Sequence, residues 1–261
     1  MADPIQKKMD FVTRVVNSVA FRLGHWVDNR QTAKVDDEIS KYTDCLATVQ
    51  AINKYFKATR LCDIGAHKGH WSFVMHRLNP DLKSVVMFEP QAKLIDNLKS
   101  RQLDGVKTKI YQCALGDSEG QLTLQGGTAS ASLYKSASNQ HHYFPGSVNQ
   151  EAELVEVKVL DDVYKADDLE YPDLIKMDVQ GYELKVLKGA SAVLANARYL
   201  VIELGLREFY KGQPQLWELW RFLDEEGYVM VDHGFELRSY TAPNELLQFD
   251  AIFMNKRFGQ S

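Results

Sequence analysis

The chain has 261 residues, 45% of them apolar and 25% charged, which suits one large α/β domain or one domain with an appendage. A formal net charge of −4 gives no general attraction to polyanions, which argues against nucleic acid as a partner. The three cysteines are widely spaced and form no C-x-x-C pair. They indicate neither a disulfide framework nor a zinc knuckle, so a reducing, cytoplasmic location is expected.

Residues 1–58 are predicted to form an N-terminal helical extension, because Phe11, Val15, Val19 and Leu23 recur at helical spacing. Charges interrupt the stretch where a signal peptide would be apolar, and no apolar run approaches the roughly 20 residues that span a bilayer. A soluble protein without a transmembrane segment is therefore expected. The basic residues of the extension indicate a solvated helix face or a peripheral membrane contact, and a homodimer is left open.

Residues 59–261 are predicted to form the main domain, since short apolar runs alternate there with helical patterns. This alternation is typical of a mostly parallel sheet with helices on both faces. Helices are expected to begin after Gly69 and at Pro90, Gly181 and Pro214. The last strand follows an extended segment without a helix and is expected to return antiparallel. The seven predicted strands are residues 60–64, 84–89, 108–113, 173–178, 199–204, 228–232 and 248–255.

A polar insertion at about residues 126–152 interrupts this alternation and is flanked by β-like pieces at 120–124 and 153–160. It is too long for a plain connection and is typical of a lid, a substrate platform or a disordered segment. Its hydroxyl and aromatic side chains are candidates for contacts with a substrate. The alternative is that they are exposed residues of a linker. The candidates are Thr128, Ser130, Ser132 and Tyr134.

The sequence "DIGAHKG" at residues 63–69 follows the first predicted strand. Gly65 allows the backbone to approach a ligand, and Gly69 allows the next helix to pack tightly on the sheet. Glu89 ends the next strand about 20–25 residues later, where an acid commonly accepts hydrogen bonds from the hydroxyls of an adenosine ribose. A purely structural turn and a metal site with His67 and His70 are the alternatives, and no metal is expected.

The turn lacks the G-x-G-x-x-G spacing of dinucleotide sites, and Asp63 is placed to hold an α-amino group. S-adenosylmethionine, which carries no phosphate, therefore suits it better than a nicotinamide dinucleotide. The candidate cofactor-binding residues are Asp63, Gly65, Ala66, His67, Gly69, Trp71, Ser72, Glu89, Pro90, Ala114, Leu115 and Asp178.

The stretch "DLIKMDVQGYELKVLKGA", residues 173–190, places Lys176 and Asp178 at the end of a buried strand. These charges have a structural explanation, in which Asp178 and Glu183 cap the following helix and Lys176 pairs with one of them. The neighbouring predicted strand also ends in an acid, Glu203, and so favours a functional cluster.

The chain also resembles the FkbM family of S-adenosylmethionine-dependent methyltransferases, through "DIGAHKGHWS", "FEP", "ALGD", "VLDD" and above all "IKMDVQGYELKVLKGA". The resemblance covers roughly Leu61 to Met254. It implies a class I, Rossmann-like methyltransferase fold with a seven-stranded sheet, and an O-methyltransferase acting on a sugar, glycan or natural-product hydroxyl.

Methyl transfer to an alcohol requires a group that takes the proton of the hydroxyl. Asp178 is the first candidate base and Glu203 is the second. His233 is the third candidate base and also a candidate substrate contact. Lys176 is expected to orient a carboxylate or a substrate oxygen. A divalent cation between the two carboxylates is an alternative. A nicotinamide-dependent oxidoreductase and a non-catalytic cofactor-binding module are the competing functions.

Overall fold

A computed structural model describes residues 38–101, 103–126, 130–144, 152–239 and 244–259. The segment Glu38–Ser261 forms one compact unit. Of the predicted N-terminal extension, only the part from residue 38 onward is described. It contains α2 (Thr43–Ile52), which packs against β9 and α3 within this unit. The predictions for residues 1–37 and for Thr128 lie outside the described residues, and the boundary at residue 58 stays a prediction.

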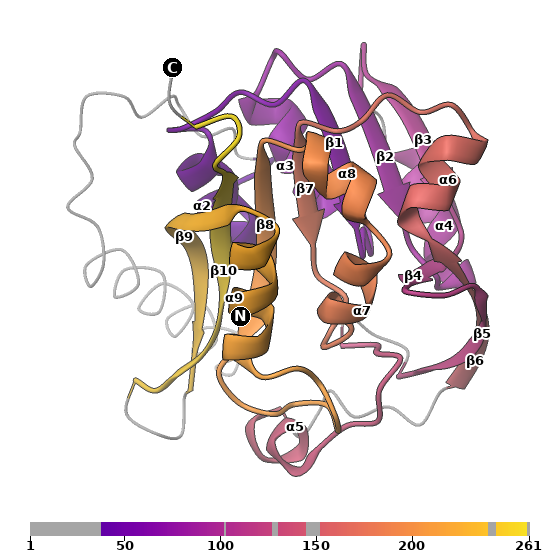
Figure 1. Cartoon of the computed structure of the whole chain (residues 1–261), viewed down its shortest axis with the longest axis vertical. Helices are drawn as coiled ribbons and strands as arrows, with labels where there is room; N and C mark the ends of the chain where they lie inside the picture. The colour runs from indigo at the N-terminus through magenta and orange to yellow at the C-terminus, as the bar shows by residue number, and fades with distance from the viewer. Residues whose placement is uncertain (1–37, 102, 127–129, 145–151, 240–243, 260–261) are drawn as a thin grey trace, which may run out of the picture. The chain divides into compact units, whose positions relative to one another are not determined.

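A seven-stranded sheet in the order β3-β2-β1-β7-β8-β10-β9 forms the centre of the unit (Figure 1). The strands from β3 to β8 along this order are parallel, and β10 is antiparallel to both β8 and β9. This is the mostly parallel sheet that the sequence predicts. The bounds are β1 Arg60–Ile64, β2 Ser84–Phe88, β3 Lys107–Tyr111, β7 Leu174–Met177, β8 Tyr199–Gly205, β9 Tyr228–Arg238 and β10 Leu246–Asn255.

The antiparallel end of the sheet follows from the length of its last connection. Only seven residues separate the end of β9 at Arg238 from the start of β10 at Leu246. A parallel neighbour needs a crossover of a dozen or more residues, whereas a hairpin needs very few. The predicted antiparallel return is confirmed, and it places the first half of β10 at the same edge as the carboxyl end of β8.

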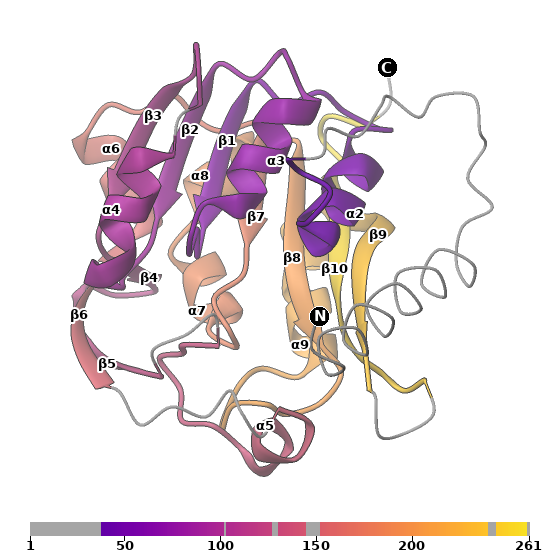
Figure 2. The ribbon, with the colours of Figure 1, turned by 180° about the vertical axis from the view of Figure 1, so that it is seen from behind.

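Helices cover both faces of the sheet, as Figures 1 and 2 show from opposite sides. One face carries α2, α3 (His70–Leu78) and α4 (Ala92–Ser100), and the other carries α6 (Leu160–Ala166), α7 (Glu183–Lys188), α8 (Ser191–Asn196) and α9 (Leu216–Glu225). The four helix starts expected from glycine and proline positions all match within about two residues. No helix in the described ranges is long and apolar enough to cross a membrane.

The segments that flank the insertion form a second, three-stranded sheet in the order β4-β6-β5. Its strands are β4 (Ala114–Gly116), β5 (Gly120–Gln125) and β6 (Ala152–Val159), and the described part of the insertion also contains α5 (Ser138–Tyr143). The two predicted β-like pieces are β5 and β6. The short elements β4, α5, α6 and α8 were not predicted, because three to seven residues carry too little periodicity to distinguish them from a loop.

Candidate functional site

A cavity of about 390 Å³ lies at the carboxyl ends of β1, β2, β7 and β8. This is the edge at which open α/β sheets bind ligands, and the volume falls within the roughly 300–1,000 Å³ of small-molecule sites. Two groups of side chains line it. One surrounds the turn after β1 and the end of β2, and the other is a group of carboxylates at the ends of β7 and β8 and on β10.

Gly65 brings the turn after β1 against the turn after β7. Its φ of +74° is in the left-handed region, and a Cβ added there would overlap the backbone carbonyl oxygen of Asp178. Only glycine satisfies both conditions. The close approach places the backbone of Gly65 and the side chain of Asp178 in the wall of the same cavity.

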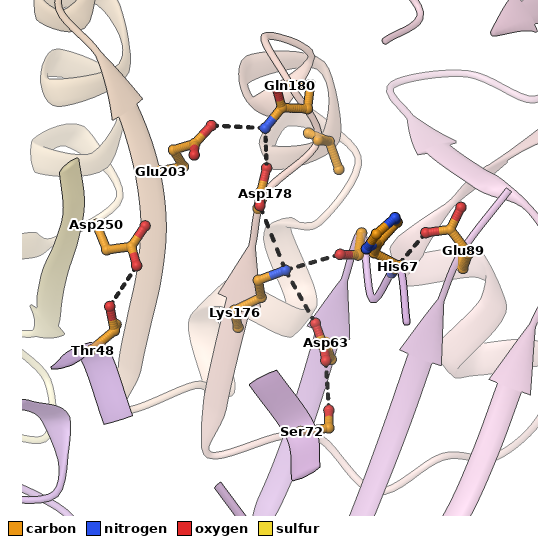
Figure 3. Close-up of polar contacts among 12 residues, drawn as sticks. Thr48, Asp63, His67, Ser72, Glu89, Lys176, Asp178, Gln180, Glu203 and Asp250 are labelled. Carbon is orange, nitrogen blue, oxygen red and sulfur yellow. Dashed lines mark hydrogen bonds and ion pairs between the residues drawn. The ribbon is translucent and has the colours of Figure 1, made fainter. Parts of the chain in front are cut away.

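Glu89 is 3% exposed at the end of β2. Its carboxylate accepts a hydrogen bond from the backbone N–H of His67 at 2.8 Å (Figure 3). It accepts a second one from the backbone N–H of Gln91 at 2.9 Å. Burial raises the pKa of Glu89 despite these two donors. The carboxylate therefore ties the turn after β1 to the tip of β2, at the predicted position for a ribose contact.

The remaining wall beside Glu89 is suited to a flat apolar group with a few polar contacts. Ala114 and Leu115 of β4 line it together with Phe88. Trp71 Nε1 and Gln91 Oε1, on two further wall residues, are buried without a hydrogen-bond partner in the described part of the chain. Buried polar atoms without partners are costly, and a bound ligand offers one way to satisfy them. These residues fit an adenosyl group.

Lys176 connects the two groups of side chains. Its Nζ atom donates to the carbonyl oxygen of Gly65 at 2.9 Å and lies 3.4 Å from Asp63 Oδ1 and 4.0 Å from Asp178 Oδ2 (Figure 3). Burial by itself lowers the pKa of Lys176, but the carboxylates of Asp63 and Asp178 outweigh burial and the net shift is upward. Lys176 is therefore a permanent cation that compensates two acids.

Three carboxylates face one end of the cavity, those of Asp178, Glu203 and Asp250. Asp250 lies opposite Glu203 in the register of the antiparallel strands β10 and β8. The carboxylate of Asp250 accepts a hydrogen bond from the hydroxyl of Thr48 at 2.5 Å. Burial, followed by the charges of Asp178 and Asp250, raises the pKa of Glu203 well above its ordinary value. Burial also raises the pKa of Asp250, to about 6. The cluster can therefore hold a proton near neutral pH.

Two glutamines donate hydrogen bonds to this group of carboxylates. Gln180 Nε2 donates to Asp178 at 2.7 Å and to Glu203 at 3.0 Å, and Gln248 Nε2 donates to the other oxygen of Glu203 at 2.5 Å. In the described residues, no group of three or more His, Cys, Asp or Glu side chains is arranged to hold a metal ion.

The predicted site residues divide into two sets. The cavity wall contains Gly65, Ala66, His67, Trp71, Glu89, Pro90, Ala114, Leu115, Ser130, Lys176, Asp178 and Glu203. The other described candidates lie outside the wall: Asp63, Gly69, Ser72, Ser132, Tyr134 and His233.

The residues outside the wall have structural contacts of their own. Asp63 is fully buried behind Lys176 and accepts a 2.5 Å hydrogen bond from Ser72. Asp63 therefore acts on a bound ligand only indirectly, through its ion pair with Lys176. The Ser132 hydroxyl donates to the backbone of Gln180. His233 lies within β9, is exposed, and contacts Glu236 at 2.8 Å.

Three functional candidates were not identified from the sequence: Gln180, Gln248 and Asp250. Asp250 had a signal, because it is an acid inside the apolar run "QFDAIFMN". An antiparallel strand brings its beginning, not its end, to the carboxyl edge of its parallel neighbours. Asp250 therefore does not belong to the acids that follow the ends of strands, which are the acids that the sequence pattern indicates.

Comparisons with known proteins agree with this geometry. The profile of the methyltransferase FkbM domain matches residues 63–230. The 2-O-methyltransferase NoeI of Sinorhizobium fredii is 25% identical over an alignment of 169 residues, and the match covers 60% of this chain and 67% of that protein. The methyltransferase sdnD of Sordaria araneosa is 34% identical over an alignment of 156 residues, and the match covers 49% of this chain and 59% of that protein.

Solved methyltransferase structures are similar only at a low level. Magnesium protoporphyrin IX methyltransferase from Synechocystis, solved with bound S-adenosylmethionine, has 12% identity and a TM-score of 0.45, with 94% of this chain and 96% of that chain covered. Precorrin-6y C5,15-methyltransferase from Geobacter metallireducens has 14% identity and a TM-score of 0.44, covering 87% and 96%. The family assignment therefore rests on the profile, whose match extends from β1 into β9 over more than half of the chain. The chain belongs to the methyltransferase FkbM domain family and is an S-adenosylmethionine-dependent methyltransferase.

Proposed function

We propose that this methyltransferase transfers the methyl group of S-adenosylmethionine to a hydroxyl of a sugar, glycan or natural-product acceptor. The observation that carries the proposal is the carboxylate cluster of Asp178 and Glu203 in the cavity wall, next to the turn at Gly65. A hydroxyl gives up its proton only reluctantly at neutral pH, and a positioned base typically contributes 10²–10⁴-fold to such a reaction. The name of NoeI, a 2-O-methyltransferase, supports the same reaction type.

The residues around Glu89 are proposed to hold the cofactor. The carboxylate of Glu89 is the acceptor for the ribose hydroxyls, and the backbone of Gly65 to His67 lies beneath the amino-acid portion. The apolar wall at Ala114 and Leu115 takes the adenine. When bound, S-adenosylmethionine supplies an electrophilic methyl group on its sulfonium.

Asp178 is proposed as the base that takes the proton of the acceptor hydroxyl, with Glu203 as the second candidate. Lys176 Nζ lies 4.0 Å from one oxygen of Asp178 and balances its charge, while Gln180 Nε2 donates a hydrogen bond to the other oxygen. The carboxylates thereby keep defined orientations, and much of the rate enhancement comes from holding base and acceptor in line and excluding water. Ser130 and Gln140, from the insertion, line the same cavity and are proposed to contact the acceptor.

The test measures transfer of a radiolabelled methyl group from S-adenosylmethionine to a panel of hexoses, 6-deoxyhexoses, N-acetylhexosamines and short oligosaccharides. Asp178→Asn is expected to lower turnover by about 10²–10⁴-fold and to leave the affinity for S-adenosylhomocysteine within about twofold. Asp104→Asn, at an exposed position, is the matched control. Full turnover by Asp178→Asn overturns the role of Asp178, and label found on a nitrogen or carbon atom of these acceptors instead of a hydroxyl oxygen overturns the hydroxyl assignment.

A further inference from the structure

Gln180 lies in the turn between β7 and α7 with its backbone in the left-handed region, at φ +53°. Such a conformation is uncommon for a residue other than glycine. Its side-chain amide lies between the carboxylates of Asp178 and Glu203 (Figure 3). Because a primary amide has two hydrogens, this geometry commits one to each of the two proposed catalytic acids.

The orientation of this amide is fixed from its other side. The hydroxyl of Tyr210 lies 2.7 Å from Gln180 Oε1 and 3.0 Å from the carbonyl oxygen of Ser130, the two acceptors within reach of its proton. Burial raises the pKa of Tyr210, so the phenol keeps that proton. An inverted amide would direct its oxygen at two carboxylates and lose both of its hydrogen bonds to them. The hydroxyl of Ser132 holds the backbone of the turn by donating to the carbonyl oxygen of Gln180 at 2.6 Å.

Building on the proposed function, we propose that Gln180 is a positioning residue for methyl transfer. Its amide holds the carboxylates of Asp178 and Glu203 in place and favours the ionised form of the base, and Tyr210 fixes the direction of the amide. The turn sequence thus supplies both the base, Asp178, and the group that orients it. A side chain that only filled space at position 180 would leave the ionisation of the acids unchanged.

The charges around the amide predict the direction of the effect. The acids disfavour one another's ionised forms, whereas Lys176 and the donors of Gln180 favour them. Glutamate at position 180 removes two donors and adds a like charge. The ionisation of the pair should therefore move to higher pH by about one unit or more. The titratable groups that face the turn are Asp63, His67, Lys176, Glu183, Glu203 and Asp250, in addition to Asp178 and Tyr210.

The first test is the pH dependence of kcat/KM for methyl transfer to the best acceptor of the sugar panel. A base must be ionised to act, so the acid limb of the Gln180→Glu profile is expected about one unit above that of the wild type, with activity recovering at high pH. Gln121→Glu, an exposed substitution on β5, controls for net charge and should leave the profile in place. A superimposable Gln180→Glu profile, or a loss equal at every pH, overturns the proposal.

A second measurement needs no acceptor and therefore separates this proposal from the proposed function. The side-chain carboxyl groups are labelled with ¹³C and titrated by NMR, with Asp178→Asn and Glu203→Gln identifying the two signals. Gln180→Glu should move the titration of the pair upward, and Tyr210→Phe should move it in the same direction by less. Unmoved titrations in both folded variants refute the positioning role. Shifted titrations in a protein that methylates no hydroxyl refute the proposed function alone.

Discussion

Replacing Gly65 by alanine tests the close approach between the turns after β1 and β7. The substitution places a Cβ onto the carbonyl oxygen of Asp178 and forces an L side chain into φ +74°. The left-handed conformation costs about 1–2 kcal/mol, and overpacking against fixed atoms costs about 1–3 kcal/mol. The free energy of unfolding should therefore fall by about 2–5 kcal/mol, which corresponds to a fall in Tm of about 4–20 °C in a domain of this size.

Gly105→Ala is the matched control, because Gly105 has a similar φ of +76° and nothing within 4 Å of an added Cβ. Its cost should be the backbone contribution alone, about 1–2 kcal/mol. Urea unfolding followed by circular dichroism measures both variants, and calorimetry with S-adenosylhomocysteine measures binding. Equal losses of stability in the two variants, or unchanged binding of the ligand by Gly65→Ala, would contradict the close approach of the two turns.

Two further predictions concern buried charges. Burial raises the pKa of Glu183 to about 7, so the stability it contributes is complete below its unfolded pKa of about 4.5 and is lost as pH rises through 7. Glu183→Gln keeps the oxygen that accepts from Val179 and Gly181, so its unfolding free energy should fall less between pH 4.5 and pH 8; an unchanged slope contradicts this. Lys176→Met leaves Asp63 and Asp178 without their cation and should lower the free energy of unfolding by about 3–5 kcal/mol. Adding Asp63→Asn should recover part of this loss. Strictly additive effects of the two substitutions in this double-mutant cycle would exclude a coupling between Lys176 and Asp63.

Local sequence patterns were sufficient for the strands of the main sheet. The apolar runs of β1, β2, β7 and β8 are long enough to form buried strands, and glycine or proline marks where the next helix begins, as at Gly69 and Pro214. The turn at Gly65 and the acid at Glu89 could be predicted as candidate site residues because residues that follow parallel strands meet at one edge of the sheet.

The sequence was less informative where a residue's role depends on partners distant in the chain. Asp63 occupies a position typical of a ligand contact, yet the hydroxyl of Ser72 and the ammonium of Lys176 cover its carboxylate. Asp250 reaches the cavity only because β10 is antiparallel. Gln180 acquires its contacts from Tyr210, 30 residues away. None of these pairings has a local pattern, since each arises from the way separate turns pack together.

Calorimetric titration of the wild type and of Glu89→Gln with S-adenosylhomocysteine tests whether this cavity holds the cofactor. We expect one binding site per chain. We also expect about 10- to 100-fold weaker binding by the variant, because a hydrogen bond to a charged group contributes about 1.5–3 kcal/mol. An absence of heat with the wild type, or equal affinity in the two proteins, would contradict the assignment of this cavity to the cofactor.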